Sequence, residues 1–89
     1  MYKIYLIAYD LKQPHKNYEE LYEEIKKYDS YWHYFNSLWL IYTIDTANSI
    51  YNKLHKYIDN NDYLLIFELN KDCQGWIPIE AWEWINSHI

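Results

Sequence analysis

The chain has 89 residues, a single cysteine and a formal net charge of -5. This length indicates one domain with a modest core, and one cysteine excludes an intrachain disulfide or a cysteine metal cluster. The basic residues are eight lysines with no arginine, which predicts weak binding to duplex nucleic acid, because that binding depends on basic side chains at phosphates and bases.

The first predicted element is a strand over residues 3–9 (KIYLIAY), which ends at Asp10 and so places a carboxylate at its carboxyl end. Successive side chains of this strand point to opposite faces of the sheet. We expect the helices to cover the face that carries Ile4, Leu6 and Ala8. Tyr5 and Tyr9 would then lie on the open face. There they would form either a stacking platform for bases or, as we favour, a dimer interface or a surface packed by the tail.

Five further elements follow in the sequence. An Asn17 cap predicts a helix whose apolar face runs from Tyr18 to Tyr28. Residues 31–35 and 38–44 form a predicted hairpin, since two aromatic runs flank the polar pair Asn36 and Ser37. Asp45 or Thr46 is expected to cap a second helix with a stripe of Ala47, Ile50, Leu54 and Ile58, and residues 63–69 (YLLIFEL) form the last strand.

The tail is predicted to form an additional helix over residues 77–88. Gly75 breaks the chain before it, and Pro78 suits a first helical turn. Ala81, Trp84, Ile85 and His88 share one side of this helix. We expect that side to cover apolar surface on its own or a neighbouring subunit, and the alternative is an aromatic wall for a ligand.

The order of these elements, βαββαβ, predicts an α+β ferredoxin-like sandwich with an extra C-terminal helix. We expect one domain over residues 1–89, with its core in residues 2–70. Five Trp, twelve Tyr and two Phe provide more aromatic area than such a core encloses, so we expect a homodimer. The sequence shows no signal peptide or membrane span, which predicts a cytoplasmic protein.

Two places carry residues suited to chemistry. Asp10 and its dimer mate would suffice for a Mg²⁺ or Mn²⁺ site, although a carboxylate that orients the following loop is the favoured interpretation. His33, Ser37 and Trp39 would place an imidazole, a hydroxyl and an indole near one end of the hairpin, as a ligand site or as cross-strand packing. His15, His55 and His88 lack the spacing of a zinc site.

The segments IAYDL, SLWLIYT and NDYLLIFEL resemble those of short, uncharacterised bacterial and phage proteins labelled SinR-like. More broadly, Tyr9 and Asp10 at the end of the first strand and the βαββαβ order resemble the small ferredoxin-like proteins of the CRISPR adaptation complex and their VapD-like relatives. The resemblance covers roughly residues 2–70. It implies a homodimer that brings two sheets together around a shared cleft, and in the nuclease members the acid matching Asp10 is associated with metal-dependent phosphodiester cleavage.

These observations together predict a homodimeric, noncatalytic binding or adaptor protein, and the resemblance implies a role in conflict between phage and host. It would grip a protein partner or a nucleotide-type small ligand in an aromatic dimer cleft, with Tyr5, Tyr9, Asp10, His33, Ser37 and Trp39 as candidate contacts. No cofactor is expected. The alternative is a metal-dependent endonuclease or endoribonuclease that uses Asp10.

Overall fold

The computed structural model describes residues 1–13 and 17–89, which form a mixed α+β domain with a four-stranded antiparallel sheet in the order β2-β3-β1-β4. This architecture is consistent with a ferredoxin-like sandwich in general. In chain order the elements are β1 (Lys3–Asp10), α1 (Glu19–Ile25), β2 (Ser30–Phe35), β3 (Leu38–Thr43), α2 (Ala47–Leu54), a 3₁₀ turn η1 (His55–Tyr57), β4 (Tyr63–Leu69) and α3 (Ile79–His88).

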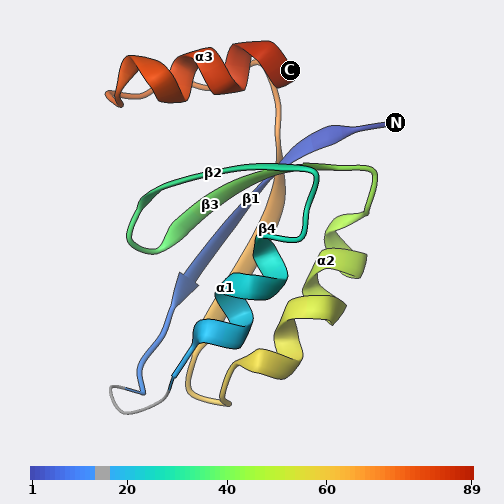
Figure 1. Cartoon of the computed structure of the whole chain (residues 1–89), viewed down its shortest axis with the longest axis vertical. Coiled ribbons are helices and arrows are strands. Elements are labelled where there is room, and N and C mark those ends of the chain that lie inside the picture. Colours follow the sequence, from blue (N-terminus) through green and yellow to red (C-terminus); the bar gives the residue numbers. More distant parts are fainter. Residues whose placement is uncertain (14–16) are drawn as a thin grey trace.

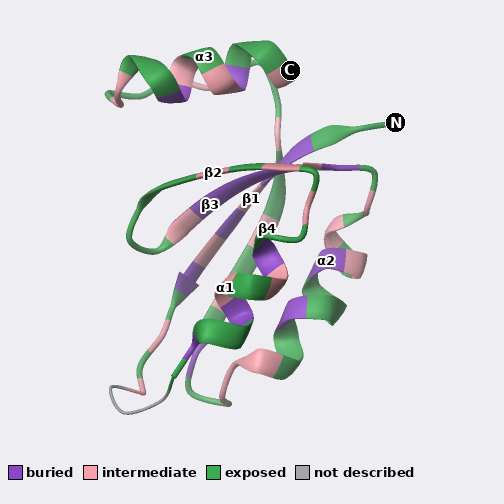
Figure 2. Cartoon of the chain, in the orientation of Figure 1, coloured by how far each residue is buried: buried purple, intermediate pink, exposed green. Residues whose placement is uncertain are grey.

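The elements stack in three layers. Helices α1 and α2 lie on one side of the sheet and α3 lies on the other (Figure 1). The two central strands, β1 and β3, carry most of the buried sheet positions (Figure 2). Strands β2 and β4 form the edges of the sheet, and each exposes several large side chains.

Local sequence signals account for the helix starts. Thr46 is the N-cap of α2, and its hydroxyl accepts a hydrogen bond from the Ser49 amide at 3.1 Å, as predicted for a helix capped at this point. Helix α1 begins at Glu19 after Tyr18, one residue later than an Asn17 cap would place it. The Asn17 Oδ1 atom still accepts a hydrogen bond from the Glu19 amide at 2.9 Å.

The main core lies between the sheet and the first two helices. The rings and aliphatic chains of one sheet face pack against α1 and α2, and the buried residues of this cluster are Tyr5, Ile7, Tyr9, Tyr18, Leu21, Ile25, Trp39, Ile41, Ile50 and Leu54. A smaller cluster lies on the opposite face, where Ile85 of α3 packs against Ile4 and Leu40. The tail helix therefore covers apolar surface of its own sheet.

The predicted hairpin is present, with β2 and β3 joined at Asn36 and Ser37. Its strands pair regularly from Ser30 to Trp32, and the register shifts between Trp32 and Phe35. Among the described residues, no helix has both the length and the apolar character needed to cross a lipid bilayer.

The core assignment predicts a position-dependent effect of truncating isoleucine. Ile50 is fully buried between α2 and the sheet, so Ile50→Ala should lower the free energy of unfolding by about 2–5 kcal/mol. Ile44 loses the same atoms in Ile44→Ala but is 61% exposed, so its effect should stay within about 0.5 kcal/mol. Urea unfolding at one protein concentration measures both, and equal losses would contradict the assigned core.

Candidate functional site

The alternation along β1 partitions its side chains as predicted, but the expected assignment of faces is wrong. Tyr5 and Tyr9 point into the main core beneath α1 and α2 and are only 7% and 8% exposed. The side with Ile4 faces α3 instead. The two rings therefore do not form an open stacking platform, because the two amphipathic helices bury the face of the sheet that carries them.

Trp39 is the centre of an aromatic cluster on the helix-covered face. Its indole Nε1 donates a hydrogen bond to the Tyr9 hydroxyl at 3.0 Å, and that hydroxyl donates to the Asn36 carbonyl oxygen at 3.2 Å. Burial raises the pKa of Tyr9, although the bond from Trp39 opposes the shift. The polar atoms of these two buried rings are thus satisfied within the fold.

His33 covers the outer side of this cluster. Its imidazole stacks on the Trp39 indole, with ring centroids 3.7 Å apart and planes inclined by 4°. Its Nδ1 atom lies 3.0 Å from the Leu38 carbonyl oxygen. The carbonyl of Ser37 accepts a hydrogen bond from the Tyr9 amide at 3.1 Å, which ties the hairpin turn to β1. The structure therefore brings Tyr9, His33, Ser37 and Trp39 together, in contacts that pack and brace the hairpin.

Asp10 lies at the end of β1, on the opposite face from Tyr9. Its carboxylate is 62% exposed and forms an ion pair with the Lys12 ammonium at 3.3 Å. The same ammonium lies 4.9 Å from the centroid of the Tyr63 ring, which is opposite Asp10 in the β1–β4 register. Asp10 is thus separate from the His33 and Trp39 cluster.

A second aspartate, Asp62, holds the loops at this end of the domain. Asp62 is 7% exposed and accepts hydrogen bonds from the amides of Lys12 and Asp59 at 2.7 and 2.8 Å. The Tyr18 hydroxyl donates to both of its carboxylate oxygens, at 3.0 and 2.8 Å. Burial raises the pKa of Tyr18, and its bond to Asp62 adds to the shift. No sequence signal distinguishes this residue from its neighbours in the run Asp59 to Asp62.

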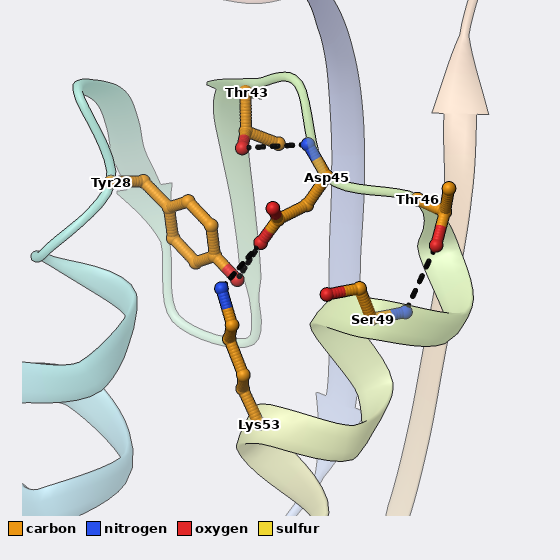
Figure 3. A network of polar contacts seen from close by, with 6 residues as sticks. All are labelled: Tyr28, Thr43, Asp45, Thr46, Ser49 and Lys53. Carbon is orange, nitrogen blue, oxygen red and sulfur yellow. Dashed lines mark hydrogen bonds and ion pairs between the residues drawn. The ribbon is translucent and has the colours of Figure 1, made fainter.

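A polar hollow of about 300 Å³ lies between the end of α1 and the start of α2. Asp45 is its central group, because its carboxylate accepts hydrogen bonds from Lys53 Nζ at 2.7 Å and from the Tyr28 hydroxyl at 3.4 Å (Figure 3). The Asp45 amide donates to the Thr43 hydroxyl at 3.1 Å. These polar groups are hydrogen-bonded to one another and connect β3, α1 and α2. We therefore interpret the hollow as a structural junction between these elements.

An apolar pocket of about 330 Å³ lies on the other face of the sheet, where the segment before α3 crosses β2 and β3. Its floor is made of leucines from the central strands. Indoles form much of its wall, and the lining residues include Leu6, Leu38, Leu40, Trp32, Trp76 and Trp82. Trp76 is fully exposed at the rim. The tail thus packs on its own sheet, as expected, and the alternative of an aromatic wall for a ligand stays a prediction.

The described residues contain no group of three or more His, Cys, Asp or Glu side chains placed to hold a metal ion. His55 is exposed on η1 and stacks obliquely on Tyr51, and His88 stacks on Trp84 in α3. His15 lies outside the described residues.

Comparison of the chain with protein-family models, with curated proteins and with solved structures found no match.

The junction around Asp45 predicts an altered tyrosine titration. Burial and then the charge of Asp45 raise the pKa of Tyr28 far above its ordinary value. Because the folded state holds this proton more tightly than the unfolded state, its stabilising effect is complete below about pH 10 and is lost at higher pH. Asp45→Asn should move the Tyr28 ionisation to lower pH. Tyrosinate absorbance, with Tyr28→Phe subtracted to isolate this ring, measures the shift, and an unchanged difference titration would contradict the assigned cause.

Proposed function

We propose that this chain is a small, noncatalytic binding or adaptor protein that acts as a homodimer built on a ferredoxin-like domain. The element order and the strand order β2-β3-β1-β4 support that topology. The observation that carries the functional proposal is the indole-walled apolar pocket beside α3, because concave apolar sites with a few polar groups are the usual binding sites of proteins.

The chemistry of the pocket favours an apolar or aromatic side chain of a protein partner. None of the described residues that line it is charged, so a ring is well accommodated there and a phosphate has no cation to meet it. A nucleotide-type ligand is the competing occupant. The resemblance of its sequence segments to those of phage and CRISPR-associated proteins supports a partner that acts in the conflict between phage and host.

This site differs from the one predicted on the hairpin. The rings of Tyr5, Tyr9 and Trp39 are buried and hydrogen-bonded or packed within the fold, whereas Trp76 is open to solvent at the pocket rim. Partner recognition typically depends on exposed aromatic side chains next to a preformed hollow. We therefore assign binding to the face that carries α3.

The proposal predicts selective binding of a model apolar side chain. With 5-fluorotryptophan incorporated, N-acetyltryptophanamide should shift the ¹⁹F resonances of Trp32, Trp76 and Trp82 and leave that of buried Trp39 unchanged, while adenosine monophosphate should shift none of them. Trp76→Ala should weaken the interaction by about tenfold, in line with loss of an aromatic anchor.

The matched control for this experiment is Tyr51→Ala, which removes an exposed ring on α2, on the opposite side of the sheet from the pocket. It should leave binding unchanged. Light scattering on the same samples should give twice the chain mass of 11.2 kDa. Absence of any shift with the amide would refute the assigned site, and selective binding of the nucleotide would replace the protein partner with the competing ligand.

The nuclease centred on Asp10 is the second candidate, because this carboxylate is exposed at the end of a strand. We expect Asp10→Asn to behave as the loss of a surface ion pair with Lys12, since the substitution keeps size and removes the charge that a hard cation requires. Mg²⁺ should then change the melting temperature of wild type and variant equally, and neither should cleave RNA or DNA above background. Metal-dependent cleavage that the substitution abolishes would establish the nuclease.

A further inference from the structure

Strand β4 forms a sheet edge with no visible protection against pairing. It pairs with β1 in regular register from Leu69 to Tyr63, without a bulge. Its sequence, YLLIFEL, contains no proline and no lysine, and Glu68 is its one charged residue. Natural edge strands usually carry prolines, lysines or bulges that block further pairing. The opposite edge, β2, has such an irregularity between Trp32 and Phe35.

Three of the β4 side chains that face the α3 side are uncovered, whereas Leu69 packs in the smaller core cluster. Tyr63, Leu65 and Phe67 are 65%, 60% and 48% exposed, because α3 packs farther along the sheet on Ile4 and Leu40. With about 150–250 Å² for a whole aromatic side chain, these three residues expose roughly 300–400 Å². The largest apolar patch of a typical monomeric protein is of this size, and such a patch is often functional.

We propose that a second copy of the chain pairs with β4 in antiparallel orientation, so that two sheets join into one of eight strands. This inference rests on the homodimer of the proposed function and specifies how it forms. A two-fold axis at Ile66, the middle residue of β4, pairs all seven residues of the strand. Such an axis is perpendicular to the sheet, so the uncovered patches of both copies lie on the same face.

The strand is complementary to itself in this register. Leu65 lies opposite Phe67 of the partner subunit, and Glu68 lies opposite Leu64 of the partner subunit, so no like charges face each other. A two-fold axis at Leu65 would place Glu68 opposite Asp62 of the partner subunit, which is unfavourable. An axis at Phe67 would shorten the ladder. Self-complementarity of length, apolar pattern and charge is the reason for choosing a second copy over an unrelated strand.

The attraction between the paired strands and the repulsion between the charges of the two copies determine how this contact depends on salt. Edge pairing sets the two patches side by side and leaves them open on one face, so the backbone hydrogen bonds of the new ladder are the main attraction in this contact. A charge of -5 on each copy opposes association at long range. Salt screens that repulsion, and the dimer should therefore become tighter between about 0.05 and 0.5 M salt.

Pairing through β4 also organises the proposed binding sites. The two α3 helices and their indole-walled pockets would lie on one face of the joined sheet, on either side of the combined patch. A partner protein that presents two apolar side chains would then engage both pockets at once, with the gain in affinity that bivalent attachment provides.

Amide hydrogen exchange of β4 tests this arrangement. In an edge strand, amides at alternate positions point away from the sheet and exchange freely, whereas a paired neighbour protects them. We expect amides throughout residues 64–69 to be protected in the wild-type dimer. Leu65→Lys, at a position that is exposed in the protomer, should halve the mass by light scattering and remove protection at alternate positions.

Tyr34→Lys is the matched control, because Tyr34 is 69% exposed on the other edge strand, and it should remain a protected dimer. Exchange of the wild type at a series of concentrations repeats the test without any substitution. A wild-type dimer whose alternate β4 amides exchange freely would refute edge pairing and leave the homodimer of the proposed function intact. A wild-type monomer would refute both.

Discussion

The arrangement of the segments at one end of the domain depends on the hydrogen bonds that the buried carboxylate of Asp62 accepts. It accepts hydrogen bonds from Lys12 after β1, from Tyr18 before α1 and from Asp59 in the turn before β4. Each of these donors would cost about 1–3 kcal/mol if it were left buried without an acceptor. One side chain thereby fixes the ends of the central strand, the first helix and the last strand relative to one another.

The two faces of the sheet differ in how completely helices cover them. The face with Tyr5, Tyr9 and Trp39 is closed by α1 and α2, and its polar ring atoms are satisfied internally. The opposite face is closed only in part, because α3 is a single helix packed at Ile4 and Leu40. Every feature that supports binding, namely the apolar pocket, exposed Trp76 and uncovered β4 side chains, results from this incomplete covering.

Sequence patterns predicted the elements better than the site. Strand β4 was predicted with the bounds observed, because a continuous apolar run between polar turns has few alternative conformations. Alternation in β1 separated Tyr5 from Ile4 but contains no information on which side the helices pack, so the face was assigned wrongly. The role of Asp62 and the pocket under Trp76 depend on contacts between segments far apart in the chain, which no local pattern encodes.

The position of β1 in the middle of the sheet has a consequence for biosynthesis. Strand β1 is synthesised before its two partners, which are Leu38–Thr43 on one side and Tyr63–Leu69 on the other. Its two hydrogen-bonding edges therefore remain unpaired until residues much later in the chain have been translated. Domains dominated by such distant pairings fold more slowly than those with local contacts. Until β4 has been made, the apolar run KIYLIAY has one hydrogen-bonding edge unpaired, and an unpaired apolar strand edge favours aggregation of the nascent chain.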